Sequence, residues 1–482
     1  MKRFAIMLII SAVIFLSYRL YSFNHFAALN SDCTIQILIT YYFNLPTDLY
    51  YWGQDRWGSL VPLIAQIFYK GFHLSPITSV SISYYLLLVL GYIGFANVLK
   101  SNFSKVVFAV ILFLPPLRFI DVLWYPTGIQ YSLLGISLIV LKNVDYSENK
   151  IKNYFLLFLV SILCIFSQWV SDAAFITILL LVLVHALFYW RQVKIKLTIF
   201  FFSVFAVVAG YFFISYGKEH AIAHTENYLG LNSLDNIARS ISKIWEAFRG
   251  LLLFQGSETL MSVYTYLSIL LIGAAVYYLI KRGAGAAIKN NRWIYFFLLD
   301  GLIAIGIALS SKWVFMNDVN RRYFFGSYLS LSFAFLLILE RLSLFGFERQ
   351  SFKIALGITV LIGAMSTPYF FKYVWLKTLR PQVKIYSEIT NLGPAGIIAE
   401  YWHSYITSAP DPSKIVSTPK DDDLVRNPEL IERVFTQPNI YIIRNDWLDL
   451  FPDTLQQFGR TLIRDGKEFT MSGCTICKYR KM

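Results

Sequence analysis

Residues 4–21 read FAIMLIISAVIFLSYRLY and follow directly on Lys2 and Arg3; this apolar stretch sets the class of fold. As a helix, a stretch of this length crosses most of a hydrocarbon core about 30 Å thick. The stretch has no small-residue cleavage site after it, so we expect an uncleaved signal anchor. The basic residues in front of it place the amino terminus in the cytoplasm.

The rest of the chain repeats this pattern, because 56% of its residues are hydrophobic and only 15% are charged. Such a composition is typical of a polytopic α-helical membrane protein, and we count about eleven apolar windows long enough to span. Helices are expected because the windows lack the ten-residue alternation of a membrane barrel. The expected spans are 4–21, 77–99, 106–120, 128–141, 154–168, 173–190, 197–215, 262–280, 293–311, 324–340 and 354–375.

The net charge of +14 is largely a signal of membrane topology. Lys and Arg gather in alternate short loops, as at Lys100 with Lys105 and at Arg191 with Lys194 and Lys196, and cytoplasmic loops carry this excess. An odd number of spans then places the carboxyl terminus outside. The sequence has no long basic helix or recognition motif, so nucleic acid is not an expected partner.

Three outer segments are long enough to carry function. The first two are loops at about 22–76 and 216–261, with helical stretches expected at 60–72 and 234–248. The third is the tail, whose apolar runs at 396–401, 414–416 and 440–443 predict strands and whose residues 427–435 predict a helix. We therefore divide the chain into a transmembrane domain, residues 1–375, and a small outer α/β domain, residues 376–482.

The first outer loop contains the most informative motif. Asp32 lies where the first span leaves the membrane, and residues 48–60 read DLYYWGQDRWGSL. A carboxylate beside a bilayer surface, followed by aromatic rings and an arginine, suits carbohydrate and phosphate chemistry. Asp32 as an ordinary loop acid or a helix N-cap is the alternative.

Four further stretches share a pattern with one superfamily: Pro115-Pro116 with Trp124 and Tyr131, Gln168-Trp169, Arg322-Tyr323-Phe324, and Glu400-Tyr401-Trp402-His403-Ser404-Tyr405. Together with Ser31-Asp32 and the aromatic run, the chain resembles the GT-C glycosyltransferases that use polyprenyl-phosphate sugars. In size, span number and outer tail it also resembles phage-type O-antigen glucosyltransferases. One departure is Cys33, which follows Asp32 where many members have a second acidic residue.

This resemblance implies inverting transfer of a single sugar, with glucose as the best guess, from an undecaprenyl-phosphate sugar to a hydroxyl of a surface glycan such as lipopolysaccharide O-antigen. The site would face the periplasm from a bacterial inner membrane. Asp32 is the expected catalytic base, since a sugar hydroxyl must lose its proton as it attacks the anomeric carbon. No cofactor and no metal are expected.

The leaving phosphate gains negative charge, so arginines near the membrane surface are expected to bind it. The candidates for the donor phosphate are Arg322, Arg321, Arg56 and Arg118. The candidates for the sugar or the acceptor are Trp52, Asp55, Trp124, Gln168, Asp172 and Trp402. Structural alternatives remain: the aromatic residues would also suit an interfacial belt, and Asp55 would also suit a salt bridge with Arg56.

Two points outside these motifs stay open. Cys474 and Cys477 form a C-x-x-C pair for which a local disulfide or a packing role is favoured over zinc. A flippase or transporter of lipid-linked saccharides would also need apolar spans, wet carboxylates and arginines, and an O-antigen polymerase or ligase would transfer a chain instead of one sugar. The charged candidates cluster at the outer ends of spans, and Asp300 is the main acid within a span. This distribution favours the active site of a transferase over a transport path through the membrane.

Overall fold

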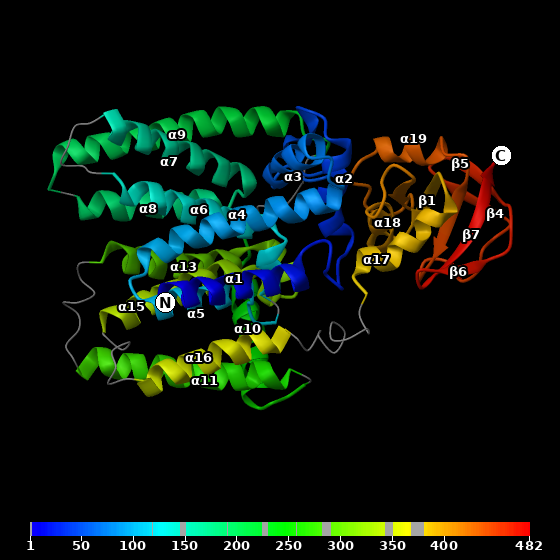
Figure 1. Ribbon diagram of the computed structural model, residues 1–482. Helices are drawn as coiled ribbons and strands as arrows, with labels where there is room; N and C mark the ends of the chain where they lie inside the picture. Colours follow the sequence, from blue (N-terminus) through cyan, green and yellow to red (C-terminus); the bar gives the residue numbers. More distant parts are fainter. Residues whose placement is uncertain are drawn as a thin grey trace. The chain divides into compact units, whose positions relative to one another are not determined.

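The computed structural model describes residues 2–117, 119–144, 151–189, 191–223, 230–256, 258–281, 291–342, 350–367 and 380–482. Helices occupy most of the chain and a sheet occupies its carboxyl-terminal part (Figure 1). The helices are α1 Lys2–Tyr21, α2 Ser31–Tyr42, α3 Leu60–Gln66, α4 Pro76–Val98, α5 Asn102–Phe113, α6 Pro126–Lys142, α7 Ile151–Val170, α8 Ala174–Phe188, α9 Val193–Glu219, α10 Leu234–Leu252, α11 Thr259–Lys281, α13 Arg292–Ser310, α14 Lys312–Met316, α15 Phe325–Arg341, α16 Gln350–Ser366, α17 Gln382–Tyr386, α18 Tyr401–Ser408 and α19 Glu429–Phe435.

Seven helices within the described residues are long and apolar enough to cross a membrane, and they lie in α1, α4, α7, α9, α11, α13 and in 321–341. The remaining expected windows fall on the shorter helices α5, α6, α8 and α16. The chain is thus a multi-pass helical membrane protein, as expected. The predicted window 106–120 is wrong at its end: α5 stops at Phe113 because Pro115 and Pro116 cannot continue a helix.

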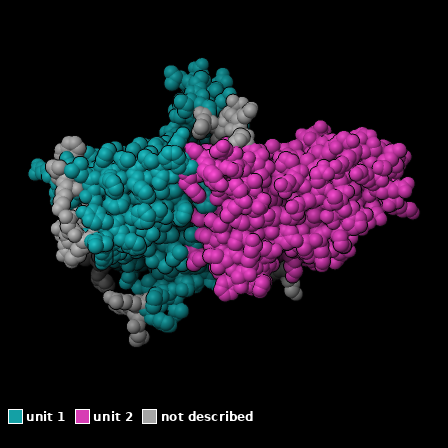
Figure 2. All heavy atoms as spheres, turned by 90° about the horizontal axis from the view of Figure 1, so that it is seen from above, with its two compact units in different colours: residues 1–17, 87–212, 226–372 teal, residues 18–86, 213–225, 373–482 magenta. Residues whose placement is uncertain are grey.

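The chain divides into two compact units, coloured separately in Figure 2. The first comprises residues 1–17, 87–212 and 226–372, and the second comprises residues 18–86, 213–225 and 373–482. The predicted domain boundary between residues 375 and 376 lies outside the described residues. The loop that follows α1 and the tail, which are far apart in sequence, belong to the same unit.

Within the first unit, glycines let two helices approach closely. A Cβ on Gly94 of α4 would lie 1.8 Å from the carbonyl oxygen of Gly135 on α6, and one on Gly135 would lie 2.3 Å from that of Gly91. Small residues at such crossings let transmembrane helices pack without a hydrophobic driving force. A larger residue at any of these positions would separate α4 from α6.

The second unit contains a seven-stranded sheet with the order β2-β1-β3-β7-β5-β4, and β6 pairs with β7. The strands are β1 Ala395–Ala399, β2 Ile415–Pro419, β3 Ile440–Arg444, β4 Thr454–Gln457, β5 Arg460–Arg464, β6 Phe469–Met471 and β7 Cys474–Lys481. The first three run parallel, with Gly396 opposite both Val416 and Ile440, and β7 joins β3 antiparallel. The predicted α/β domain is confirmed, although only its parallel half was expected.

The parallel half forms because β1 and β2 are apolar and fully buried, which is typical of strands covered by crossover helices. The crossovers are α18, between β1 and β2, and α19, between β2 and β3. A Cβ on Gly396 would lie 2.4 Å from the carbonyl oxygen of Val434 on α19. Glycine at this position therefore lets α19 press against the sheet.

The antiparallel half was missed because β4, β5 and β6, which pair with one another or with β7, are short and partly exposed. Their turns give weak signals as well. Phe458 and Gly459 both have positive φ, 53° and 70°, between β4 and β5, and Ser472 and Gly473 repeat this between β6 and β7. Two-residue turns of this kind usually begin with Asn, Asp or Gly rather than Phe.

The C-x-x-C pair lies on β7, where Cys474 and Cys477 are both buried and both free. Residues three apart on a strand point to opposite faces of the sheet, so their sulfur atoms cannot meet. Of the two favoured alternatives, the local disulfide is therefore excluded. The packing alternative accounts for both thiols.

Candidate active site

Asp32 lies in the first turn of α2, within the second unit. The N-cap of this helix is Asn30, whose side-chain oxygen accepts a hydrogen bond from the backbone N–H of Cys33 at 3.1 Å. Asp32 is therefore not the cap, and its side chain is free for other contacts. A first-turn position also suits a carboxylate, because backbone N–H groups point toward that end of the helix.

Helix α2 is held against the tail by a shared apolar core. Ile35, Leu38 and Ile39 recur at helical spacing and pack in one cluster with residues of β1, α18 and α19. The buried members from the tail include Ile398, Tyr405, Val416, Leu430 and Val434. This packing fixes the start of α2 beside the start of α18.

Two side chains from the tail contact Asp32 there. The Tyr401 hydroxyl donates a short hydrogen bond to Oδ1 of Asp32, and Nη2 of Arg426 lies 3.4 Å from the same oxygen. Arg426 Nε also donates to the Tyr401 hydroxyl at 3.0 Å. Among the described residues no hydrogen-bond partner is found for Oδ2, and the Asp32 side chain is 19% exposed. One carboxylate oxygen is held and the other stays open.

The electrostatics of this cluster keep its donors protonated. Burial, together with the neighbouring Asp32 carboxylate, raises the pKa of Tyr401 well above its usual range, so its hydroxyl retains the proton that it donates. Burial alone would lower the pKa of Arg426, but the oxygens of Tyr401 and Asp32 raise it overall. The cluster therefore contains a neutral phenol and a charged guanidinium against one carboxylate.

Arg426 is fixed from several directions, and its side chain is only 12% exposed. Its backbone N–H donates to the Tyr405 hydroxyl at 2.7 Å, and its Nη1 donates to the carbonyl oxygen of Gly53 at 3.3 Å. Gly53 has a φ of +67°, and a Cβ there would lie 2.7 Å from Cδ of Arg426. The glycine of the aromatic run is thus what lets the arginine reach Asp32.

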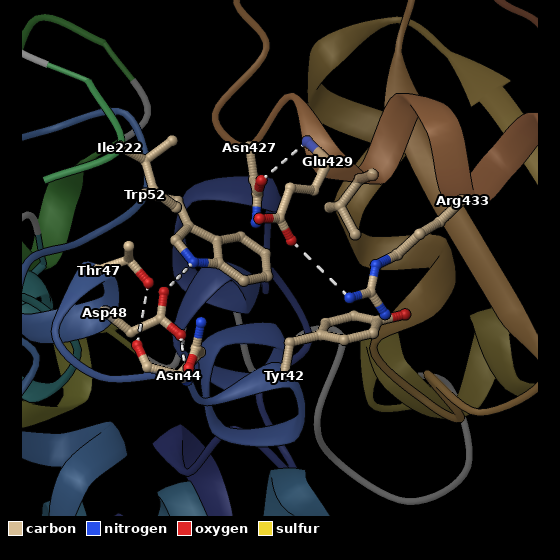
Figure 3. Close-up of a pocket in the computed structure, with 10 residues that line it drawn as sticks. Tyr42, Asn44, Thr47, Asp48, Trp52, Ile222, Asn427, Glu429 and Arg433 are labelled. Carbon is tan, nitrogen blue, oxygen red and sulfur yellow. Dashed lines mark hydrogen bonds and ion pairs between the residues drawn. The ribbon is translucent and has the colours of Figure 1, made fainter.

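The same unit contains a polar cavity of about 260 Å³, whose lining includes Trp52 and Asn427, the chain neighbours of Gly53 and Arg426 (Figure 3). Its floor contains Trp52, whose Nε1 donates to Oδ1 of Asp48 at 2.7 Å, and Asp48 Oδ2 accepts from the backbone N–H of Asn44 at 2.6 Å. Burial raises the pKa of Asp48. The wall from the tail carries Glu429 and Arg433. The full lining is Tyr42, Asn44, Thr47, Asp48, Trp52, Ile222, Asn427, Glu429, Leu430 and Arg433.

Four other candidates from the sequence lie in the same unit as Asp32. Trp52 is only 1% exposed, so its ring offers little surface for stacking on a sugar. Arg56 donates to Gln54 at 2.7 Å and stacks over the Trp57 ring. Asp55 is partly exposed beside it. Trp402 is 50% exposed and packs edge-on against Tyr401.

The other candidates lie in the first unit. Arg321 pairs with Glu258 at 2.6 Å, whereas Arg322 donates to the Tyr323 hydroxyl at 3.0 Å. Both stand on the 3-10 turn η4, Arg321–Phe324, which leads into α15. Trp124 and Gln168 are buried, and Asp172 is exposed between α7 and α8. Arg118 lies outside the described residues, and all these assignments stay predictions.

Sequence reasoning missed the two partners of Asp32. Tyr401 belongs to the quoted Tyr-Trp-x-x-Tyr stretch, from which only the neighbouring Trp402 was named as a site residue. Arg426 lies in a loop with no motif around it, and nothing in the sequence distinguishes it. Among the described residues, no group of three or more His, Cys, Asp or Glu side chains is placed to hold a metal ion.

No protein-family model matches the sequence, and no curated protein does. Solved structures with a similar course of the chain include the oligosaccharyltransferase AglB from Archaeoglobus fulgidus in complex with an inhibitory peptide and a dolichol-phosphate. That likeness has 12% identity, a TM-score of 0.47, and covers 92% of this chain and 70% of AglB. ArnT from Cupriavidus metallidurans in the apo state has 10% identity, a TM-score of 0.45, and coverage of 99% and 97%. The same protein bound to undecaprenyl phosphate gives 10% and 0.43, with coverage of 99% and 98%.

Proposed function

We propose that this membrane protein transfers one sugar from a polyprenyl-phosphate carrier to a hydroxyl of a glycan, with inversion and with Asp32 as the base. We base the proposal on the Asp32 cluster, since the likenesses to solved structures are weak. The observation that carries it is the asymmetry of the carboxylate. Oδ1 is held by Tyr401 and Arg426, while Oδ2 has no partner among the described residues.

The chemistry follows from that asymmetry. The acceptor's hydroxyl oxygen attacks the anomeric carbon of the donor sugar from the face opposite the phosphate. As this bond forms, the open Oδ2 of Asp32 accepts the proton of that hydroxyl. The bond between that carbon and the phosphate oxygen breaks, and the polyprenyl phosphate leaves with the electron pair. Tyr401 and Arg426 hold the carboxylate so that it does not rotate away, and a charged arginine balances the charge of Asp32. Arg321 and Arg322 remain the proposed ligands of the donor phosphate.

The finer proposal names glucose, undecaprenyl phosphate and lipopolysaccharide O-antigen, acting on the periplasmic face of a bacterial inner membrane. The support for it is the resemblance stated from the sequence and the distribution of Lys and Arg between loops. The amino terminus would then lie in the cytoplasm and the sheet domain in the periplasm.

Transfer of labelled glucose from undecaprenyl phosphate to purified lipopolysaccharide tests the proposal. Membranes containing the wild type, Asp32→Asn or Asp422→Asn are compared at equal expression; Asp422 is an exposed carboxylate of the same unit and serves as the control. We expect transfer with the wild type and the control, and loss with Asp32→Asn. A panel of other lipid-phosphate sugars follows if glucose fails.

Two outcomes would overturn the proposal. If the wild type transfers no sugar from any donor to any acceptor, but redistributes lipid-linked glycans between the two leaflets, the protein is a flippase. Transfer of whole glycan chains instead of single sugars would identify a polymerase or ligase.

A further inference from the structure

We propose that the cavity beside Asp32 is a subsite for one uncharged sugar residue of the acceptor glycan. This inference rests on the proposed function and adds to it the part of the acceptor that the protein recognises. The cavity measures about 260 Å³, slightly below the range of about 300–1,000 Å³ typical of pockets for drug-sized ligands. A cavity of this size suits a single sugar ring better than a disaccharide.

The groups around the cavity match the hydroxyls of a sugar. Glu429 accepts hydrogen bonds and Arg433 donates them, whereas a sugar hydroxyl does both. Figure 3 shows these two side chains on one wall, facing Tyr42 and Trp52, and their ion pair spans 3.8 Å. Asn44 and Thr47 add polar atoms on the other wall. Partly exposed polar groups therefore line the cavity on two sides.

The polar groups in the floor already have partners. Trp52 uses its N–H on Asp48, so the buried indole leaves no unpaired donor. Tyr42 lies with its ring centroid 6.2 Å from that of Trp52, and the Tyr42 ring gives the C–H groups of a sugar a surface to pack on. Tyr42 is partly exposed, so it presents the ring that Trp52 does not.

The charges of the cavity select against other ligands. The lining contains two carboxylates, Asp48 and Glu429, and one guanidinium, Arg433, which stacks on the Tyr42 ring at 4.7 Å. Two carboxylates and one guanidinium give the lining a net negative charge, which disfavours binding of a phosphate. We therefore do not place the carrier's phosphate in this cavity. The glycan end of an acceptor has no such charge.

The chain ties this cavity to Asp32. Trp52 of the floor precedes Gly53, whose carbonyl oxygen accepts from Arg426, and Asn427 of the lining follows Arg426. A sugar seated in the cavity would therefore lie beside the two segments that position the base. A hydroxyl of the acceptor glycan next to the seated sugar ring would be the one that Asp32 deprotonates.

Saturation-transfer NMR on the full chain in lipid nanodiscs tests the subsite without any donor. The probes are methyl glucoside and methyl galactoside as neutral sugars, and glucosamine and inorganic phosphate as charged ones. The variant Glu429→Gln/Arg433→Gln removes the pair in the cavity and keeps the net charge. The variant Glu432→Gln/Arg460→Gln removes a comparable ion pair, at 2.6 Å, that involves the same helix but does not line the cavity.

We expect a neutral glycoside to receive saturation from the wild type and the control pair, and at least fivefold less from the cavity variant. In transfer assays the cavity variant should raise the acceptor KM roughly tenfold, with kcat at saturating acceptor nearly unchanged. Thermal unfolding of all variants checks that each one is folded.

Three results are decisive. Equal binding by the wild type and the cavity variant, or preference for glucosamine or phosphate over every neutral sugar, overturns the subsite. Transfer that proceeds with an unchanged acceptor KM in the cavity variant overturns the subsite and leaves the proposed function standing. Sugar binding that depends on the pair, without transfer from any donor, supports the subsite and removes the proposed function.

Discussion

Asp32 and Asp300 are carboxylates withdrawn from water in different units, and their surroundings differ in kind. Asp300 on α13 is 3% exposed and accepts hydrogen bonds from Tyr131 at 2.9 Å, Thr177 at 2.7 Å and Ser330 at 2.5 Å. These hydroxyls come from α6, α8 and α15 and occupy both carboxylate oxygens. Asp32 has a guanidinium, one phenol and an open oxygen. A carboxylate satisfied on both oxygens joins helices, whereas one that is held on one side keeps its capacity to take a proton.

The largest effect should come from Asp32→Asn. The amide oxygen can still accept the hydrogen bond of Tyr401, so the fold should survive, but no group remains to take the proton. We expect the rate of transfer to fall by roughly 10²–10⁴-fold, the usual contribution of a general base. Initial rates at equal amounts of folded protein measure this. A residual rate above a tenth of the wild type would show that another group is the base.

Arg426→Gln should come next, because it removes the charged support of Asp32 without touching the reacting atoms. A misplacement of about 1 Å can cost on the order of 100-fold, so we expect kcat to fall roughly 10- to 100-fold. The acceptor KM should change little, and Arg426→Lys should recover part of the loss. Arg380→Gln, which removes an exposed ion pair of the same unit, is the control. A rise of the acceptor KM as large as the fall of kcat would indicate a binding role instead.

Asp300→Leu should act on stability and not on chemistry. It leaves three hydroxyls without their acceptor, and hydrogen bonds between transmembrane helices average about 0.6 kcal/mol and reach about 1.7 kcal/mol, so we expect a loss of about 1–2 kcal/mol. Thermal unfolding and the rate per folded molecule separate the two effects. Loss of transfer in fully folded Asp300→Leu would show that Asp300, like Asp32, is needed for the reaction itself.

Gly53→Ala tests how Arg426 is placed. The positive φ costs about 1–2 kcal/mol for a residue with a Cβ, and this Cβ would also collide with Cδ of Arg426. Gly459→Ala is the matched control, since Gly459 has a φ of +70° with nothing within 4 Å of its Cβ position. Both variants should lose similar stability, and only Gly53→Ala should lose transfer, by several-fold. Equal transfer in the two variants would mean that Arg426 tolerates displacement.

The smallest effect concerns pH. Because the pKa of Tyr401 is raised above its ordinary value of 10.0, its stabilising contribution is fully present below pH 10 and lost only as the pH rises through the raised value. The wild type and Tyr401→Phe should therefore show parallel pH profiles of kcat up to about pH 10. A decline of the wild type alone between pH 8 and 10 would show that Tyr401 ionises in that range.

The sequence predicted the parts of this molecule whose signal is local. Long apolar windows and the short apolar runs of the parallel strands carry their own pattern, so the long apolar helices and β1 to β3 were expected. The hairpins of β4 to β7 were not, because Phe458 adopts a positive φ that turn statistics assign to other residues. The end of α5 was missed because hydropathy continues past Pro115 while helical geometry does not.

The candidate site divides in the same way. Asp32 and Gly53 stand in a recognisable motif, and Ile35, Leu38 and Ile39 carry a helical spacing that would have predicted α2. The partnership of Asp32 with Tyr401 and Arg426 depends on tertiary packing across most of the chain. Nothing around Arg426 in the sequence reports that packing, so no local pattern could assign it.

The hydrogen bond between Asp32 and Tyr401 joins residues 369 positions apart, which matters while the chain is being synthesised. At a synthesis rate of roughly 5–20 residues per second, Asp32 waits for roughly 20–70 s before its partner is made. By then, the ribosome has synthesised the membrane spans that lie between these two residues. A nascent or truncated chain therefore carries the acid without its support. The proposed activity should therefore appear only after the segment that contains Tyr401 and Arg426 has been synthesised.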